Sequence, residues 1–398
     1  MQTELADFIR DTPEGREADA ILRKCVHCGF CSATCPTYQL LGDELDSPRG
    51  RIYLIKQALE GAPVTARTQL HLDRCLTCRA CETTCPSGVQ YGRLADIGRA
   101  VVEERVPRSP WQRVKRALLA FALPRRALFA GLLRLGGLVR FLFPRLVPAP
   151  AAPAGAWPAP RHARRMLVLA GCVQPALAPR INAAAARVLD RRGISLLEAP
   201  GAGCCGGLRF HLNDQDAGRA DMRALIDAWW PQVERGEIEA IVITASGCGT
   251  TVKEYGHLLR EDPAYRDKAA RISALARDLS EVVEPGAGGA LGRVAFHSPC
   301  SLQHGQQLRG KVEALLEGAG YELTSVPDAH LCCGSAGTYS ILQPTLSLQL
   351  RDRKLAALQG GAPAAIATAN IGCLTHLQGG APLPVRHWIE LLDELPQG

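Results

Sequence analysis

This 398-residue sequence is poor in aromatic side chains, in long apolar runs and, over one stretch, in acidic residues. Phe, Trp and Tyr make up only 5% of it, so we expect a core built mainly from Ala, Leu and Val. The leucine-rich segment 105–147 has no uninterrupted apolar run of about 18 residues, the length that a membrane-spanning helix needs. A hydrophobic content of 47% nevertheless indicates a folded protein, long enough for two or three domains.

We also expect no secretory signal, because Met1–Asp11 contains Glu4 and Asp7 and no apolar run. We therefore expect a cytoplasmic protein with reduced cysteines.

Acidic residues are absent between Glu104 and Asp190, an interval that holds fifteen Lys and Arg. The net charge of +7 is therefore misleading, since the remaining 31 basic residues face 39 acidic ones. This distribution predicts one local contact surface and no general affinity for nucleic acid.

Within the basic interval, residues 125–143 place Arg and Leu on opposite sides of a helical wheel. Such a helix fits an anionic membrane surface, an acidic partner or the surface of its own protein, and the sequence does not choose among the three. A Pro- and Ala-rich linker is expected over 148–160. The helix residues are Arg125, Arg126, Arg134 and Arg140 on one side and Leu128, Leu132, Leu135, Leu138 and Leu142 on the other.

Two cysteine runs, beginning at Cys25 and Cys75, have the same spacing CxxCxxCxxxCP. This is the spacing by which two-cluster ferredoxins hold a pair of 4Fe-4S clusters, with the fourth cysteine of each run serving the other cluster. Three closely spaced thiolates reach three irons of a cube, and the proline then turns the chain away. The spacing predicts one cluster on Cys25, Cys28, Cys31 and Cys85, and a second on Cys75, Cys78, Cys81 and Cys35.

Zinc and disulfide bonds are the alternatives to iron-sulfur clusters for the two cysteine runs. Zinc would use four thiolates from paired CxxC knuckles and would leave cysteines such as Cys31 and Cys35 without a role. Disulfides do not fit a long chain without a secretory signal. Eight cysteines in two identical runs match two cubes, so iron-sulfur clusters are favoured.

Helices are expected to surround the two runs. Residues 14–24 lead into the first run, Ser47 and Pro48 provide a cap and a first-turn proline for a helix that reaches Leu59, and Tyr91–Glu104 follows the second run. Arg49 and Arg51, at the start of the middle helix, either raise a cluster potential from nearby or simply mark an exposed helix start.

The second half of the sequence is duplicated. Strands followed by cysteines recur at offsets of 128, 128, 128 and 125 residues, which indicates two α/β repeats. Each cysteine follows an expected parallel strand, at the edge where open α/β sheets place their sites. The strands expected are Met166–Ala170, Ile194–Glu198, Ile238–Thr244, Val294–His297, Glu322–Val326 and Ala364–Ala369, the helices include Asp214–Glu234 and Leu346–Gln359, and the cysteines are Cys172, Cys204, Cys205 and Cys248, then Cys300, Cys332, Cys333 and Cys373.

A nucleotide site is not expected at Gly201–Gly206, although the segment reads GxGxxG. The second copy, Ala329–Gly334, keeps the cysteine pair and loses the first two glycines. For each repeat three interpretations of the thiols remain open: a cluster, a redox dithiol, or buried cysteines without chemistry. A functional site is preferred in the second repeat, which has His297, His304, His330 and His376 where the first offers mainly His211.

Segments 25–48, 49–57 and 71–89, followed by two cysteine-cysteine-glycine modules, resemble the iron-sulfur subunit of bacterial glycolate oxidase, which is a glycolate dehydrogenase. The resemblance implies FAD-binding partner subunits that oxidise glycolate to glyoxylate, while this chain passes electrons to a membrane quinone or another acceptor. It also implies a peripheral position on the inner face of the cytoplasmic membrane.

Similar modules occur in heterodisulfide reductase, where they hold a noncubane cluster and end in CxxC. Here the ends read Cys248-Gly-Thr-Thr251 and Cys373-Leu-Thr-His376, so the second cysteine of CxxC is missing from each. A third, noncubane cluster in the second repeat therefore stays an open question. Two further functions also remain open: a heterodisulfide-reductase-like thiol catalyst, and the equivalent subunit of a lactate or glycerol-3-phosphate dehydrogenase.

The sequence thus predicts an α+β multidomain protein, in which a helical two-cluster ferredoxin domain precedes two α/β cysteine-rich (CCG) repeats. No residue of this chain is expected to catalyse hydroxyacid oxidation. The domains expected are 1–105, 106–160 for the basic segment and linker, 161–285 and 290–398.

Overall fold

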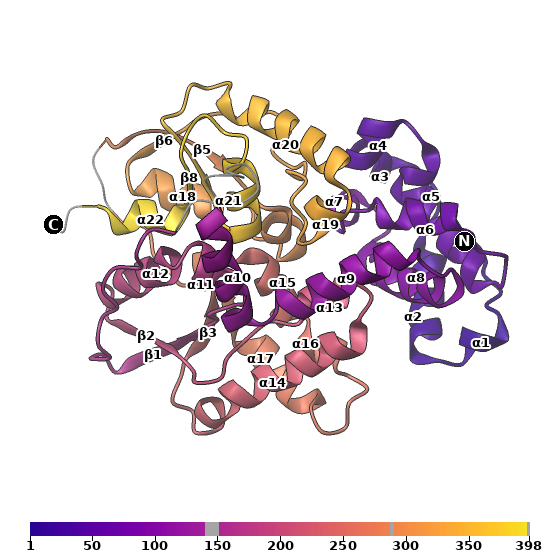
Figure 1. Cartoon of the computed structure of the whole chain (residues 1–398), viewed down its shortest axis with the longest axis horizontal. Coiled ribbons are helices and arrows are strands. Elements are labelled where there is room, and N and C mark those ends of the chain that lie inside the picture. Colours follow the sequence, from indigo (N-terminus) through magenta and orange to yellow (C-terminus); the bar gives the residue numbers. More distant parts are fainter. Residues whose placement is uncertain (140–150, 287–289, 396–398) are drawn as a thin grey trace.

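The computed structural model describes residues 1–139, 151–286 and 290–395, which form a helical N-terminal part and two α/β units (Figure 1). The fold class predicted from the sequence is confirmed. The exact domain boundaries stay a prediction.

The N-terminal part is a set of short helices wrapped around a small apolar core. Thr12 and Ser47 cap α2 and α5 by accepting hydrogen bonds from Gly15 N and Gly50 N, each followed by a proline in the first turn. Helices α5 and α8 pack closely at Gly98, where a Cβ atom would lie 2.5 Å from Ile55. The elements are α1 (Asp7–Arg10), α2 (Pro13–Lys24), α3 (Phe30–Ala33), α4 (Pro36–Leu41), η1 (Glu44–Asp46), α5 (Pro48–Leu59), α6 (Ala66–Asp73), α7 (Ala80–Thr84) and α8 (Tyr91–Arg105).

The basic segment forms two helices, α9 (Pro110–Ala122) and α10 (Arg126–Val139). Several of their large apolar side chains face solvent, whereas others, such as Leu119 and Leu128, are half-buried, and α10 contacts α11. The two helices are therefore only partly packed on their own protein. Arg140 and Leu142 lie outside the described residues. The exposed side chains are Trp111 (73%), Val114 (49%), Leu118 (61%), Phe121 (53%), Leu132 (47%), Leu135 (63%) and Leu138 (72%).

The first α/β unit has a four-stranded parallel sheet in the order β2-β1-β3-β4. In its centre Met166 pairs with both Leu196 and Ala240. Its elements are β1 (Arg164–Val168), α11 (Gln174–Leu177), α12 (Arg180–Asp190), β2 (Ile194–Glu198), α13 (Gly207–His211), α14 (Gln215–Glu234), β3 (Ala240–Ile243), α15 (Ser246–Lys253), α16 (Tyr255–Leu258), α17 (Arg266–Leu275), β4 (Ala276–Asp278) and η2 (Leu279–Glu281).

The second unit repeats this arrangement with the strand order β6-β5-β7-β8. Val294 takes the central position and pairs with Leu323 and Ala365. Its elements are β5 (Gly292–His297), η3 (Ser301–Gly305), α18 (Lys311–Gly318), β6 (Tyr321–Leu323), α19 (Tyr339–Leu342), α20 (Pro344–Gln359), β7 (Ala365–Thr368), α21 (Ile371–Gln378), β8 (Val385–His387) and α22 (Trp388–Asp393).

The two units share one apolar core, to which both sheets and helices α12, α18 and α22 contribute. Helix α12 packs on α22, and its counterpart α18 packs on η2, so the contacts repeat in the manner of a local two-fold. The ring of His387 at the end of β8 also lies 2.9 Å from the Thr244 carbonyl at the end of β3. The shared core makes the two units one body.

None of the helices in the described residues is both long enough and apolar enough to cross a bilayer.

Candidate metal centres

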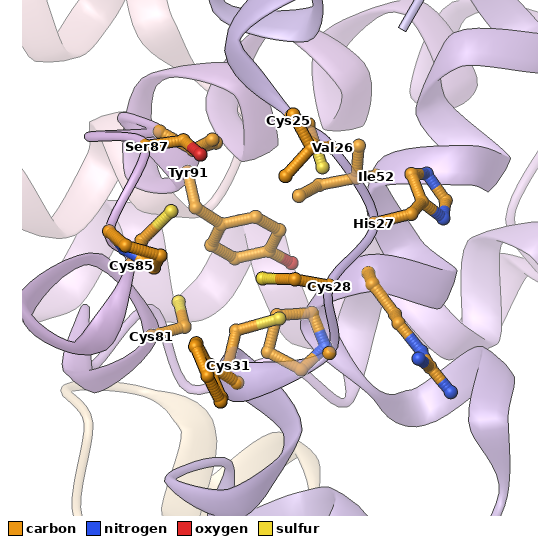
Figure 2. Close-up of a pocket in the computed structure, with 16 residues that line it drawn as sticks. Cys25, Val26, His27, Cys28, Cys31, Ile52, Cys81, Cys85, Ser87 and Tyr91 are labelled. Carbon is orange, nitrogen blue, oxygen red and sulfur yellow. The ribbon is translucent and has the colours of Figure 1, made fainter.

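The first candidate centre is a pocket in the N-terminal part that is lined by cysteines from both runs. Cys25, Cys28 and Cys31 come from the loop between α2 and α3 and from α3 itself, and Cys81 and Cys85 come from α7 and its end (Figure 2). Positive φ angles at His27 (56°) and Gly29 (86°) fold this loop tightly around the space between the sulfurs.

The second candidate centre is a neighbouring pocket with the reciprocal composition. It is lined by Cys75, Cys78 and Cys81 of the second run and by Cys35 of the first. Cys81, assigned to this centre by the spacing, lines both pockets. The fold therefore brings Cys85 to the first run and Cys35 to the second, as crossed ligation requires, while the ligand roles themselves stay a prediction.

Burial changes the acidity of the thiols in the second pocket. It raises the pKa of Cys78 and of Cys81 well above the usual range, with neighbouring thiols adding to the effect. At neutral pH these groups hold their protons unless a metal replaces them. Each pocket is lined by at least four cysteines, with Cys81 common to both, and this donor set fits an iron-sulfur cluster.

Arg51 and Arg49 differ in their burial and in their partners. Arg51 is buried, and its Nη1 atom lies 3.9 Å from the Cys35 sulfur. Its Nη2 atom lies 3.2 Å from the carboxylate of Asp46, which also pairs with Arg74 at 2.8 Å. Arg49 is 38% exposed and pairs with Glu44, although it also lines the first pocket. Arg51 is therefore a buried charge next to a sulfur of the second pocket, whereas Arg49 is a half-exposed charge at the edge of the first.

The two pockets also differ in exposure. Beside the first, Cys28 is exposed, and so are Val26 (68%) and Phe30 (61%). Beside the second, Cys78 packs in an apolar cluster with Cys300 and Cys332 of the second α/β unit. One pocket thus opens to the surface, and the other faces the second repeat.

Further contacts fix the N-terminal part on the α/β units. The Tyr339 hydroxyl donates a hydrogen bond to the Arg74 carbonyl (3.1 Å), and Thr83 Oγ1 lies 2.9 Å from His304 Nδ1. Arg79 also forms an ion pair with Glu254 of the first unit.

The thiols of each repeat converge in a quartet at the carboxyl edge of the parallel sheet. In the second repeat the sulfurs of Cys300 and Cys332 are 3.5 Å apart, and Cys333 lies next to Cys332 and Cys373. The first repeat has the same arrangement, with Cys204 next to Cys172 and Cys205, and Cys205 next to Cys248.

The glycine after each cysteine pair has a specific structural role. Gly206 and Gly334 have φ angles of 80° and 89°, and their N–H groups point at the sulfurs of Cys204 and Cys332 at 3.4 Å. A Cβ atom at Gly334 would lie 2.5 Å from the Ser347 carbonyl oxygen. The left-handed turn therefore needs glycine, which explains why Cys-Cys-Gly recurs.

Of the histidines named from the sequence, His297 forms a compact buried group with two thiols. Its ring lies within 4.8 Å of the sulfurs of Cys333 and Cys373. Burial lowers the pKa of His297 to about 3, with Lys354 and His376 adding to the shift, so the ring is neutral.

Three other histidines have partners among the protein groups around them. His304 lies between Thr83 and the His330 carbonyl. His376 faces Ser347, and His211, half exposed, faces Asp96 at 3.5 Å.

Two buried charged groups at these sites were not predicted. Asp46 sits between Arg51 and Arg74 beside the second pocket, and Lys354 lies 4% exposed next to the second quartet, where it donates to the Asp328 carbonyl. The signal for Lys354 was its place in the helical stripe Leu346, Leu350 and Leu358, because a lysine on a buried helix face needs anionic or polar neighbours.

Comparison with family models identifies two types of domain. A 4Fe-4S dicluster domain matches residues 21–89, and a cysteine-rich domain matches residues 166–253 and again 294–378. Iron-sulfur binding and the duplicated cysteine-rich repeat are thereby confirmed.

Relatives match over most of the chain. The glycolate oxidase iron-sulfur subunit of Escherichia coli (strain K12) is 56% identical, covering 99% of each chain. The probable glycolate oxidase iron-sulfur subunit of Bacillus subtilis (strain 168) is 29% identical, covering 90% of this chain and 89% of the relative. Lactate utilization protein A of Geobacillus thermodenitrificans (strain NG80-2) is 30% identical over 54% of this chain and 92% of the relative.

Proposed function

The chain belongs to the family of glycolate oxidase iron-sulfur subunits, and on that basis we propose that it is the electron-transfer subunit of a flavin-dependent glycolate dehydrogenase complex. In this proposal, glycolate loses two electrons and two protons to FAD on partner subunits and becomes glyoxylate. The flavin then gives up its electrons one at a time to this chain.

The observation that carries the proposal is the exchange of cysteines between the two pockets. Cys85 lines the pocket of the first run, and Cys35 lines the pocket of the second. We assign one 4Fe-4S cluster to Cys25, Cys28, Cys31 and Cys85 and the other to Cys75, Cys78, Cys81 and Cys35. When bound, such clusters supply one-electron redox chemistry, and the crossed thiolates hold them close together.

Differences in exposure support a direction for the relay. The exposed Cys28, with Val26 and Phe30 beside it, is where a flavin-bearing partner has the shortest approach to a cluster. Cys78 at the other pocket faces Cys300 and Cys332, so the electrons have a path into the second repeat.

The acceptor side involves helices α9 and α10. They present Trp111, Phe121 and Leu135 to solvent on a segment that lacks acidic residues, a composition typical of helices lying in a membrane interface. This supports peripheral binding to the inner face of the cytoplasmic membrane and delivery of electrons to a quinone there.

The test is purification of the chain with and without its partner subunits, with iron, sulfide and flavin quantified and glycolate, lactate and glycerol 3-phosphate supplied with a dye acceptor. The proposal predicts a brown chain with about eight irons from the N-terminal clusters and no flavin, and glycolate oxidation only in the complex. Oxidation of glycolate by the isolated chain, or preference of the complex for lactate, would refute it.

A further inference from the structure

The side chain of His297, at the end of β5, is only 2% exposed, and neither ring nitrogen has a hydrogen-bond partner among the described residues. A buried polar group without a partner costs on the order of 1–3 kcal/mol, so such groups are rare in folded proteins. Two orphaned nitrogens on one ring point to a partner that is not a protein atom.

The surroundings of His297 show what kind of partner fits. Its ring lies within 4.8 Å of the sulfurs of Cys333 and Cys373, and all three residues are buried. They come from three different strand ends, since Cys333 follows β6 and Cys373 lies in α21 after β7. One imidazole and two thiols converging from separate loops form a ligand set for a transition metal.

More sulfur adjoins this set. Cys332 lies beside Cys333, and its sulfur is 3.5 Å from that of Cys300. The buried ammonium of Lys354 is close enough to the quartet to interact with Cys333, Cys332 and Cys300, and it offsets negative charge there. The second repeat thus supplies four sulfurs, one nitrogen and a neighbouring cation.

The first repeat has no counterpart of this ring. An offset of 128 residues places Leu169 at the position of His297, and Leu169 is 2% exposed within an apolar core. His376, at the place of the second CxxC cysteine, already has partners, because its Nε2 lies 3.2 Å from the Ser347 hydroxyl. The orphaned ligand is therefore specific to β5 of the second repeat.

We propose that His297 is a ligand, together with Cys333 and Cys373, of an iron centre in the second repeat. Iron accepts mixed imidazole and thiolate ligands, and a neutral imidazole in place of a thiolate makes a centre less negative and raises its reduction potential. Cys300 and Cys332 lie against Cys78, so this centre is next to the second N-terminal pocket. The choice of iron over zinc rests on the proposed function, whereas the ligand role of His297 does not.

The experiment compares the whole chain, purified anaerobically, with His297→Leu and His297→Cys. Pulsed EPR is used to detect nitrogen coupling from a coordinated imidazole, and iron and zinc are counted per chain. A matched control is His304→Gln, because His304 is equally buried but both of its ring nitrogens have partners.

The proposal predicts nitrogen coupling in the unaltered chain and in His304→Gln, and its complete loss in both His297 variants. Iron should fall in His297→Leu and stay in His297→Cys, with the signals of the N-terminal clusters unchanged.

Unchanged coupling and iron in both variants would overturn the ligand role, even if one variant folded poorly. Loss of zinc in place of iron would overturn the assignment of the metal. Absence of any 4Fe-4S signal from the unaltered chain would instead count against the proposed function.

Discussion

The Nη1 atom of Arg51 lies 3.9 Å from the sulfur of Cys35, and the Arg51 side chain is 1% exposed. A fixed positive charge in a dry site stabilises the reduced, more negative state of a cluster. The Arg51 charge therefore acts on the cluster that we assign to Cys35, Cys75, Cys78 and Cys81.

We expect Arg51→Gln to lower the reduction potential of that cluster by on the order of 60 mV or more, which for one electron is about 1.4 kcal/mol. Arg51→Lys should restore part of the shift, because it keeps the charge. Arg49→Gln is the matched control, since Arg49 is 38% exposed and paired with Glu44. An EPR-monitored redox titration checks this, and equal potentials in all four proteins would contradict it.

Gly334 should tolerate no side chain. We expect Gly334→Ala to lower the free energy of unfolding by about 2 kcal/mol or more, because the left-handed backbone and the 2.5 Å approach to the Ser347 carbonyl both oppose a Cβ atom. Gly310→Ala shares the positive φ of 73° but meets nothing within 4 Å, so it should cost only about 1 kcal/mol. Denaturant unfolding measures the free energy of unfolding of the two variants. Equal decreases in the two would contradict the expected strain at Gly334.

The pH dependence of stability should include a contribution from His387. Burial lowers its pKa to about 4 in the folded chain, against about 6.5 when unfolded, so the folded state stays neutral while the unfolded state takes up a proton. The contribution is complete above pH 6.5 and is lost as the pH falls toward 4.

Between pH 6.5 and 5 this loss should amount to about 1.5 kcal/mol in the unaltered chain. His387→Gln keeps a group able to bond the Thr244 carbonyl but cannot titrate, so its stability should fall less over the same range. Parallel pH profiles from denaturant unfolding would disprove the contribution.

Binding to anionic vesicles should depend on the exposed apolar residues of α9 and α10. We expect Leu135→Glu and Phe121→Glu each to weaken binding to phosphatidylglycerol vesicles about tenfold, because each removes apolar contact and adds a repelled charge. Leu348→Glu is the control, an exposed apolar residue on α20 at 43%. Flotation assays in which all three variants bind like the unaltered chain would contradict membrane contact through this segment.

The sequence predicted the pattern of elements better than their ends. The strand Ile194–Glu198 is observed as β2 with the same bounds, and the helix after Ser47 is capped as expected. Strands β4 and β8 were not predicted, because each has only three residues and neither leads to a cysteine, the mark by which the other strands were recognised. Short strands like these carry no periodicity of their own.

At the sites, spacing predicted which cysteines lie together, because a repeated motif encodes its own geometry. The burial of Asp46 and Lys354 could not be read in this way, since it depends on which helix faces meet after folding. The same holds for the burial of Arg51. Arg51 lies two residues after Arg49 on α5, which places its side chain on the helix face toward the core, whereas Arg49 lies on the outer face.

The central claim is that the two cysteine runs exchange their fourth ligands, and Mössbauer spectroscopy of ⁵⁷Fe-labelled Cys85→Ser and Cys28→Ser chains tests it most directly. The account predicts that both substitutions perturb the same cluster and leave the Arg51-adjacent cluster intact, whereas Cys35→Ser perturbs that one alone. If Cys85→Ser instead disturbed the cluster held by Cys75 and Cys78 and left that of Cys28 unchanged, the exchange would be disproved.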